Sequence, residues 1–599
     1  MRDLFKLNRY FKKYKGTVIL GALFLILGNC FLVGIPILIR EAINHVERIV
    51  QQHGTEFNGL LDVLSHHNLG WDLTRTALWL VGAVVMYALL LFATRQTLIV
   101  ASRRIEYDIR NEVFEHLLKL PQSFFSSWNS GDIFVRATED ISRVRDYFGP
   151  GVMYTINTVS RAGIIITIMV IVNAQLTFWA LLPLPVLTIL AYKLSGYINE
   201  RSNIIQQQYS RIANRAQETF SSMRLIKAYV REDHQQKLFE RESEEFRSQK
   251  LKLAFVESIF FPMLNLLIGL SVVLVVWKGG IMVIDKKILV GNIAEFLIYV
   301  AYLTWPVASL GYTLNLLQRS AASNTRIQEL LRIPTEIEDD EDTDHSITDL
   351  KGAIEFRDVH FKYLSSKHET LKGISFRVEP GQHVAFVGRT GSGKSTLVEL
   401  IPRLYNAGSG EILIDNHPIS RIPLKVLRDH IGFVPQETFL FSDTIAENVA
   451  FGVKNATPEQ IEKAAEKAQI LENILEFEKK FETILGERGI TLSGGQKQRT
   501  SIARALIKNP DILIFDDSLN AVDTKTEDAI LDHLNNEMRG KTTIMISHRI
   551  STIRHADVIY VLKDGQIVES GNHQTLLERD GFYADMFHKQ QLEQELEQI

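Results

Sequence analysis

The chain has 599 residues, of which 46% are hydrophobic and 23% charged, and its net charge is −4. This length predicts several domains rather than one. The nearly balanced charge argues against a nucleic-acid partner held by net basicity. The single cysteine, Cys30, excludes an internal disulfide and lies in an apolar run, where we expect it to fill space.

Six apolar segments in the first half of the chain are candidates for membrane spans. A helix needs about 20 predominantly apolar residues to cross a bilayer, so the second and fourth segments must extend beyond their apolar cores. The first is too long for the apolar region of a signal peptide, about 7–15 residues, and is predicted to be retained. The predicted spans are Thr17–Ile39, Ala77–Ala93, Gly151–Val172, Leu176–Tyr192, Ala254–Trp277 and Ile293–Leu317.

Basic residues are concentrated in the two links that follow the second and fourth spans. Loops rich in lysine and arginine face the cytoplasm. The links Asn173–Gln175 and Lys278–Asn292 carry few basic residues and are predicted to lie outside. We therefore predict a multi-pass protein of the lipid bilayer, with both termini in the cytoplasm.

The two inward links are too regular to be plain loops. Apolar side chains recur at helical spacing after the second span, which predicts an amphipathic helix continuing into the cytoplasm. Pro121 and the stretch Ser123–Gly131 interrupt this helix, and the second link has a predicted turn near Ser221–Arg224. Each hairpin would carry a short segment that can touch a soluble domain. The apolar repeat consists of Ile105, Ile109, Val113, Leu117 and Leu120.

One arginine, Arg161, lies inside the third predicted span. A charge at the centre of a bilayer costs several kcal/mol, so this side chain should face protein or a water-filled cavity. Two interpretations remain open. Arg161 is either a charge in a substrate pathway, or it forms an ion pair or a hydrogen bond to helix carbonyls.

The second half of the chain reads as a soluble α/β domain. We predict a helical membrane domain over residues 1–330, an acidic linker over 331–350, and the α/β domain with a helical C-terminal tail over 351–599. The linker contains Pro334 and an acidic run between residues 336 and 344. Alternating apolar positions predict strands over Ala353–Phe361 and Leu371–Val378.

A glycine-rich stretch follows the apolar run His383–Val387 and leads into Thr396–Leu404, which has helix-forming composition. Strand, G-x-x-x-x-G-K-S turn and helix together predict a phosphate-binding loop. Backbone N–H groups can turn toward an anion at the positive end of the helix, the lysine can reach the β- and γ-phosphates, and the serine can ligate Mg²⁺. The loop consists of Gly388, Arg389, Thr390, Gly391, Ser392, Gly393, Lys394 and Ser395.

Two further segments belong to the same chemistry. The apolar strand Ile512–Phe515 ends in Asp516 and Asp517, and a carboxylate in this position beside a phosphate loop holds Mg²⁺. Serine and two glycines also precede a predicted helix, Lys497–Ile507, and form a second anion site without a lysine of its own. This pattern indicates that the second site completes a nucleotide site on another molecule. Its residues are Ser493, Gly494, Gly495 and Gln496.

With these motifs in this order, the chain resembles, over essentially its whole length, a half-transporter of the ATP-binding-cassette (ABC) exporters of multidrug or lipid type. The resemblance implies six transmembrane helices with long cytoplasmic extensions, fused to an α/β P-loop nucleotide-binding domain. It implies an ATP-hydrolysing translocase that uses ATP and Mg²⁺ in a bacterial cytoplasmic membrane. It also implies two cassettes that face head to tail, with each ATP held between one chain's Walker A loop and the other's signature.

The resemblance assigns roles to individual positions. The segments Ser123–Trp128, Ser222–Ala228 and Gly486–Gly489 would transmit motion between the domains. For ATP binding, the resemblance implies that Tyr363 stacks on adenine, that Gly388–Ser395 with Thr396 is the Walker A loop, and that Ser493–Gln496 is the signature. For the metal, it implies that Asp516 is the Walker B aspartate and a ligand beside Ser395, and that Gln436 is the Q-loop residue that joins Mg²⁺ to the membrane interface. Asp523 would belong to the D-loop, and His548 would be the switch histidine.

One position departs from the family pattern. Family members that hydrolyse ATP well carry glutamate after the Walker B aspartate, whereas this chain has Asp517. Aspartate is one methylene shorter, and a misplacement of about 1 Å can cost about 100-fold in rate. We therefore expect a slow, degenerate site in one subunit of a heterodimer whose partner supplies the glutamate.

Two alternatives stay open: a homodimeric exporter with two slow sites, and an ATP-gated regulatory membrane protein with little transport. An importer subunit fits poorly because importers usually keep membrane and nucleotide chains separate. The apolar spans exclude a soluble P-loop ATPase. For an exporter, amphipathic drugs or lipids are the favoured substrates, and no nucleic acid is expected.

Overall fold

The computed structural model describes residues 8–53, 67–486, 489, 492–518 and 537–597. The chain separates into two compact units. The helical unit comprises Met1–Glu115 and Ile133–Arg332, and the sheet unit comprises His116–Asp132 and Ile333–Ile599. The segment His116–Asp132, which includes the short helix α5 (Gln122–Ser127), therefore belongs to the second unit, although the residues before and after this segment belong to the first.

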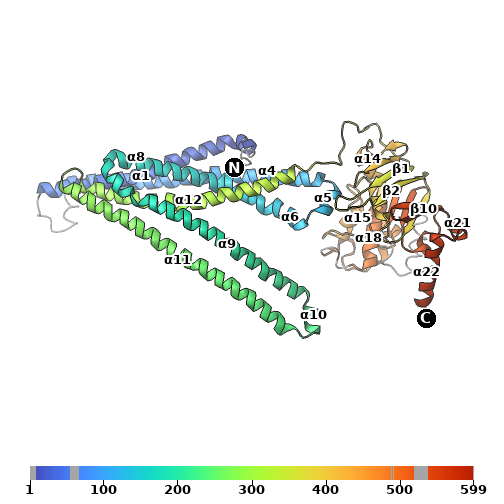
Figure 1. Ribbon diagram of the computed structural model, residues 1–599. Helices are drawn as coiled ribbons and strands as arrows, with labels where there is room; N and C mark the ends of the chain where they lie inside the picture. Colours follow the sequence, from blue (N-terminus) through green and yellow to red (C-terminus); the bar gives the residue numbers. More distant parts are fainter. Residues whose placement is uncertain (1–7, 54–66, 487–488, 490–491, 519–536, 598–599) are drawn as a thin grey trace. The chain divides into compact units, whose positions relative to one another are not determined.

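The helical unit consists of long helices joined by short turns (Figure 1). α9 and α11 run side by side, and α10 lies at the turn between them (Figure 1). The helices are α1 (Asn8–His53), α3 (His67–Thr94), α4 (Val100–Lys119), α6 (Ser130–Val135), α7 (Ile141–Asp146), α8 (Val152–Leu181), α9 (Pro183–Ser221), α10 (Met223–Ala228), α11 (Glu232–Ile284) and α12 (Val290–Leu331), with π-helical turns η2 (Arg95–Ile99), η3 (Arg136–Asp140) and η4 (Tyr147–Gly151).

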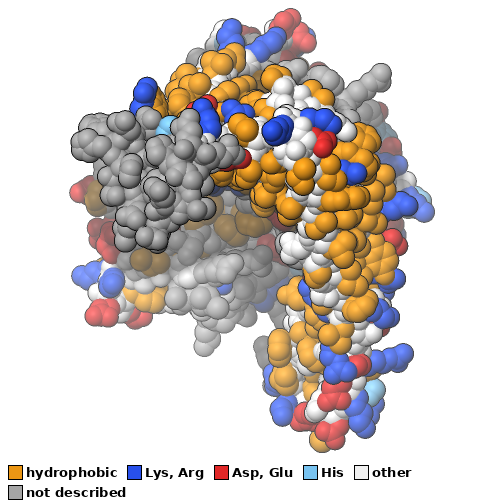
Figure 2. All heavy atoms as spheres, turned by 90° about the vertical axis from the view of Figure 1, so that its left-hand side faces the viewer, with side chains coloured by type: hydrophobic (Ala, Val, Ile, Leu, Met, Phe, Trp, Pro, Cys, Tyr) orange, Lys and Arg blue, Asp and Glu red, His pale blue; other side chains and the backbone are white. Residues whose placement is uncertain are grey.

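Five helical stretches among the described residues are long and apolar enough to cross a membrane. Large hydrophobic side chains on them face outward, as expected where lipid replaces water. In Figure 2, hydrophobic side chains cover the flanks of the long helices, and charged side chains gather at the lowest end of the arm built by α9, α10 and α11. The stretches are Arg9–Arg48, Leu73–Lys119, Ser130–Leu181, Asn265–Ile284 and Val290–Leu331. The predicted span Leu176–Tyr192 is not among these five and runs from α8 into α9, so the number six stays a prediction.

The amphipathic helix predicted after the second span is confirmed. All five side chains of its apolar repeat are buried, and Pro121 precedes α5 in an extended conformation. The predicted turn near Ser221 is also confirmed, because α9 ends there and α10 begins at Met223. The predicted link Asn173–Gln175 is shorter than expected. Only Asn173 leaves the helical conformation, and its Oδ1 accepts a hydrogen bond from the Leu176 N–H at 2.8 Å.

A buried ion pair joins the first and last helices of the helical unit. Arg40 of α1 donates from Nη1 to Oε2 of Glu295 in α12 at 3.1 Å, and Glu295 is fully buried. Nearby, the Gly291 N–H donates to Oδ1 of Asn44 at 2.9 Å. A Cβ atom at residue 291 would lie 2.5 Å from the Arg40 carbonyl oxygen, so glycine permits this close approach.

The sheet unit contains two sheets. The first is antiparallel with strand order β2-β1-β4-β5, and the second has the order β10-β9-β3-β8-β7-β6, in which only β10 is antiparallel. The strands are β1 (Ile354–Phe361), β2 (Leu371–Val378), β3 (His383–Gly388), β4 (Ser409–Ile414), β5 (His417–Pro418), β6 (Ile431–Val434), β7 (Ile512–Asp516), β8 (Thr542–Ile546), β9 (Val558–Lys563) and β10 (Gln566–Gly571).

Helices and hydrophobic cores hold the central strands in place. The helices of this unit are α5, α13 (Lys394–Leu400), α14 (Leu424–Asp429), α15 (Ile445–Ala450), α16 (Pro458–Lys467), α17 (Leu471–Glu476), η5 (Lys480–Glu482), α18 (Gly494–Leu506), α20 (Ile550–Ile553), α21 (His573–Glu578) and α22 (Phe582–Glu597).

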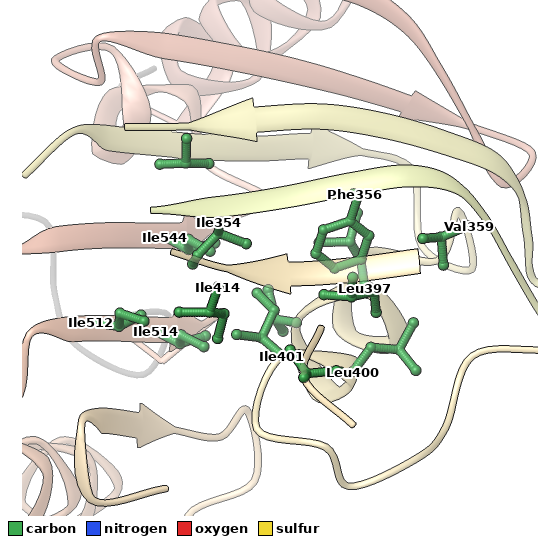
Figure 3. Close-up of a cluster of buried hydrophobic side chains, with 14 of the residues drawn as sticks. Ile354, Phe356, Val359, Leu397, Leu400, Ile401, Ile414, Ile512, Ile514 and Ile544 are labelled. Atoms are coloured by element: carbon green, nitrogen blue, oxygen red, sulfur yellow. The ribbon is translucent and has the colours of Figure 1, made fainter. Parts of the chain in front are cut away.

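One core lies between the two sheets and α13, where Leu397 and Ile401 contact the cluster drawn in Figure 3. On β3, Val384 and Phe386 belong to this core, whereas Ala385 and Val387 belong to a second core shared with α15, α16 and α18. β3 is therefore buried on both faces, as is typical of a central parallel strand. The phosphate loop that follows it starts from a fixed position.

The acidic linker is attached to the sheet unit at several points. The Leu424 N–H donates to Oδ1 of Asp339 at 2.8 Å, and the Asp344 N–H donates to the Arg421 carbonyl at 2.8 Å. The Asn406 amide also donates to the Glu336 carbonyl at 3.1 Å. The acidic side chains of the linker are largely exposed, as predicted, but its backbone and Asp339 are hydrogen-bonded to the sheet unit.

Candidate nucleotide-binding site

The loop between β3 and α13 is held by close backbone packing. Gly393 has φ +101°, a conformation that favours glycine. A Cβ atom there would lie 2.8 Å from Cδ2 of Leu371 and 3.0 Å from the Thr370 carbonyl oxygen. At Gly388, a Cβ atom would lie 2.2 Å from the carbonyl oxygen of Leu562. Both glycines are thus required by space.

Lys394 folds back into this loop. It is 5% exposed, and its Nζ donates to the carbonyl oxygens of Gly388 at 2.9 Å and Arg389 at 3.1 Å. Burial lowers the pKa of Lys394, and the carboxylates of Asp517 and Asp516 oppose that shift.

The loop also presents groups that suit a phosphate. The buried Oγ of Ser392 has no hydrogen-bond partner among the described residues. Buried hydroxyl groups are normally hydrogen-bonded, and a phosphate oxygen could accept a hydrogen bond from this one. Arg389, Thr390 and Gly391 are exposed, whereas Thr396 is buried. The loop residues therefore fit a nucleotide phosphate.

Ser395 and Asp516 lie together although 121 residues separate them. The Ser395 hydroxyl donates to Oδ1 of Asp516 at 3.0 Å. Burial raises the pKa of Asp516 to about 6; the nearby Asp517 adds to the rise, while the Ser395 hydrogen bond and Lys394 oppose it. A carboxylate and a hydroxyl oxygen side by side are the ligand types that Mg²⁺ prefers.

Asp517 contacts both Gln436, the predicted Q-loop residue, and His548, the predicted switch histidine. It is 6% exposed and has φ +47°, and its N–H donates to the Ile546 carbonyl at 2.9 Å. Its Oδ2 accepts a hydrogen bond from Nε2 of Gln436 at 3.5 Å. Its Oδ1 accepts one from the backbone N–H of His548 at 3.3 Å, and His548 Nε2 lies 3.4 Å from Oδ2. The structure therefore brings Gln436, Asp517 and His548 together.

Tyr363 lies beside the start of α13. Its hydroxyl is 2.9 Å from Oγ1 of Thr396 and donates to Oε2 of Glu399 at 3.3 Å. Its ring meets those of Phe361 and Tyr405 edge to face. The hydroxyl is thus tied to the helix that follows the phosphate loop.

The signature residues lie at the exposed start of α18. The Ser493 Oγ accepts a hydrogen bond from the Gln496 N–H at 3.3 Å, and the Ser493 N–H donates to Oε1 of Gln496 at 3.0 Å. This reciprocal capping box holds the helix start. Ser493 and Gly494 are exposed, and Gly495 and Gln496 are half-buried. The predicted D-loop residue Asp523 and two residues of the Gly486–Gly489 segment lie outside the described residues.

Arg161 contacts an aromatic ring in the helical unit. Its guanidinium lies over the ring of Tyr302 at 5.1 Å, and its buried Nε has no hydrogen-bond partner in the described part of the chain. A cation–π contact of this kind stabilises a desolvated guanidinium. Among the described residues, Arg161 forms no ion pair, which was one of the predicted alternatives.

One residue at this site carries no motif that sequence reasoning could have found. Gln590 of α22 accepts a hydrogen bond from the Ile550 N–H at 2.9 Å and donates from Nε2 to the carbonyl oxygen of His548. Its position in a polar helix gave no signal, because the contact depends on a separation of 42 residues from His548.

Together, these features define a P-loop nucleotide-binding protein with helices able to cross a membrane. The family described as "ABC transporter transmembrane region" matches residues 18–307, and the family described as "ABC transporter" matches residues 371–520. The chain belongs to the ABC transporter family and is an exporter with membrane and ATP-binding domains in one polypeptide.

Curated relatives match over most of their length. The chain is 37% identical to "Probable multidrug resistance ABC transporter ATP-binding/permease protein YheI" of Bacillus subtilis, covering 82% of this chain and 83% of the relative. It is 34% identical to "Multidrug resistance-like ATP-binding protein MdlA" of Escherichia coli, covering 89% and 90%. It is 35% identical to "ATP-dependent lipid A-core flippase" of Saccharophagus degradans, covering 81% of each. These relatives support ATP-driven export by a multi-pass membrane protein.

Proposed function

We propose that this chain is one subunit of a heterodimeric exporter and that its own Walker A and Walker B residues form a slow ATP site. The proposal rests on the identity of residue 517: this chain has an aspartate where family members that hydrolyse ATP efficiently carry glutamate. The Asp517 carboxylate contacts Gln436 and His548, so the catalytic neighbours are present and the side chain between them is short.

The length of the side chain at position 517 decides whether its carboxylate can reach the attacking water. A general base must come within hydrogen-bond distance of the water whose proton it takes. The aspartate carboxylate is set back by one methylene, and its two oxygens are already engaged by Gln436 and the His548 N–H. Misplacement by about 1 Å can lower a rate about 100-fold. The site would then hold ATP and hydrolyse it slowly.

Nucleotide binding uses residues that are intact. Lys394 and the phosphate-loop N–H groups would hold the phosphates, and Tyr363 would stack on adenine. Mg²⁺, held by Ser395, Gln436 and Asp516, would neutralise phosphate charge. The exposed signature at Ser493–Gln496 would complete the competent ATP site of the partner subunit, and Asp523 is the proposed D-loop residue of the ATP-binding set.

ATP binding would drive transport by favouring one state of the pair. Closure of the two cassettes would be passed through Ser123–Trp128 and Ser222–Ala228 to a domain of six spans, and hydrolysis at the competent site would reset it. We place the membrane domain at residues 1–330, the linker at 331–350 and the nucleotide domain at 351–599. Both termini would lie in the cytoplasm of a bacterial cell.

Amphipathic drugs or lipids are the proposed substrates. The names of the relatives refer to multidrug resistance and to a lipid A-core flippase. Arg161, whose Nε has no hydrogen-bond partner among the described residues, is proposed to lie on the substrate pathway.

The test is ATP hydrolysis by the purified chain, alone and with a half-transporter that carries the glutamate. Alone, the chain should bind Mg·ATP but turn it over slowly, and Asp517→Glu should raise its kcat about 10- to 100-fold. The mixed pair should be fast, and Asp517→Asn should leave most of that rate. Fast hydrolysis by the chain alone would contradict the heterodimer.

The same chemistry leaves two alternatives, a homodimer with two slow sites and an ATP-gated regulator. Substrate flux in vesicles separates them. A homodimer would transport slowly without a partner, whereas a regulator would move no dye or lipid even with the partner present.

A further inference from the structure

The C-terminal helix α22 is firmly attached to the sheet unit where it begins. The carboxylate of Glu569 in β10 accepts hydrogen bonds from the N–H groups of Phe582 and Tyr583, the latter at 3.1 Å. A carboxylate at a helix N-terminus is stabilising because it satisfies orphan N–H groups and faces the positive end of the dipole. Tyr583 is fully buried, and its hydroxyl lies 2.7 Å from Nδ1 of His573.

The first residue of this helix lies beside the phosphate loop. The guanidinium of Arg389 is 5.6 Å from the centre of the Phe582 ring, and the ammonium of Lys563 is 5.5 Å from it. Arg389 is the second residue of the Walker A motif. The start of α22 and the start of the phosphate loop are therefore in contact.

Eight residues further along, about 12 Å of helix, α22 reaches the turn that carries His548. The side-chain amide of Gln590 accepts from the Ile550 N–H at 2.9 Å and donates to the His548 carbonyl. It thereby fixes both ends of a three-residue turn. The same turn places His548 Nε2 3.4 Å from Oδ2 of Asp517. A two-point contact of this kind limits rotation of the turn in a way that one hydrogen bond would not.

We propose that Gln590 is a positioning residue of the nucleotide site: it holds the His548 turn against Asp517 and, through α22, ties that turn to the phosphate loop. The proposal rests on the proposed role of His548 in ATP hydrolysis. Gln590 contacts the backbone of residues 548 and 550 and is not among the residues proposed to hold the nucleotide or Mg²⁺. Its loss should slow the chemical step and leave ATP affinity nearly unchanged.

The experiment compares variants of the full-length chain in lipid nanodiscs by ATP hydrolysis and by deuterium uptake of the segment 548–553. Gln590→Ala should lower kcat about three- to tenfold, the effect of one or two hydrogen bonds, with KM within twofold. It should also speed exchange of the Ile550 amide at least about tenfold, because that amide loses its acceptor. Gln591→Ala, an exposed neighbour on the same helix, should match the wild type in both measurements.

A near-isosteric variant guards against misfolding. Gln590→Glu keeps an oxygen for the Ile550 amide but loses the donor to the His548 carbonyl, so kcat should fall while exchange of that amide stays slow. Wild-type kcat and slow exchange in Gln590→Ala would overturn the proposal.

His548→Ala separates this proposal from the one on which it depends. It should lower kcat at least as much as Gln590→Ala, without faster exchange of the Ile550 amide. If it keeps the wild-type kcat, the proposed role of His548 fails. If it lowers kcat while Gln590→Ala changes neither measurement, only the role of Gln590 fails.

Discussion

The phosphate-loop cluster and the signature cap are two parts of the sheet unit with opposite surroundings. Lys394 and Asp516 are 5% and 3% exposed and are hydrogen-bonded to other residues of their own cluster. Ser493 and Gly494 stand exposed at a helix start whose cap is closed by Gln496. The first cluster is already assembled within the chain. The second presents a preformed helix end to whatever approaches from outside, which agrees with its proposed use by a partner subunit.

The comparison is tested most strongly by one variant in each cluster. Lys394→Ala should weaken Mg·ATP binding by the isolated chain about 30-fold or more, because a desolvated charge contact is worth about 2–5 kcal/mol. Gly494→Glu should leave that affinity within twofold but stop fast hydrolysis by the heterodimer. Fluorescent-nucleotide titration and ATPase assays measure the two effects. Equal loss of affinity in both isolated variants would show that the clusters act as one site within the chain.

The tight construction of the first cluster predicts a stability effect. Gly393→Ala should lower the free energy of unfolding of the sheet unit by about 2–4 kcal/mol, because it combines a positive φ with a Cβ clash. Gly540→Ala is the matched control: its φ is +78° and no atom of the described residues lies within 4 Å of the added Cβ, so it should cost about 1–2 kcal/mol. Thermal unfolding of both purified variants measures the difference. Equal losses of unfolding free energy in the two variants would mean that Leu371 and Thr370 can move aside to accommodate the added Cβ.

Burial of the first cluster also predicts a pH dependence. The pKa of Asp516 is raised from 3.8 to about 6. Its protonated form is therefore favoured in the folded chain, and the stability gained at low pH is lost as pH rises through about 6. Mg·ATP needs the ionised carboxylate, so affinity should fall up to about tenfold per unit below pH 6. Titrations between pH 5 and 8 test this, and Asp516→Asn should bind weakly with a flatter profile.

Local patterns predicted the sheet unit well. β2 spans the predicted residues Leu371–Val378, and β7 extends the predicted strand by one residue to Asp516. The phosphate loop follows a strand and precedes a helix, as its motif requires. These features depend on alternation of side chains and on glycine at fixed offsets, which short windows of sequence contain.

Long-range contacts could not be predicted in the same way. The Arg40–Glu295 pair joins residues 255 apart, and the Gln590 amide meets a backbone turn that carries no recognisable motif. The break at Asn173 was placed correctly, but its brevity depends on a side-chain cap that replaces a loop. Such details depend on which surfaces meet after folding, and a single sequence does not encode them as local patterns.

The Arg40–Glu295 contact constrains how the helical unit can rearrange. Separating α1 from α12 at this point would leave the buried carboxylate of Glu295 without its arginine partner, at a cost of about 3–5 kcal/mol. The neighbouring Asn44–Gly291 hydrogen bond would break in the same motion. A transport cycle that avoids this cost must move α1 and α12 together as one rigid body. The openings that admit and release substrate must then form between other helices of the bundle.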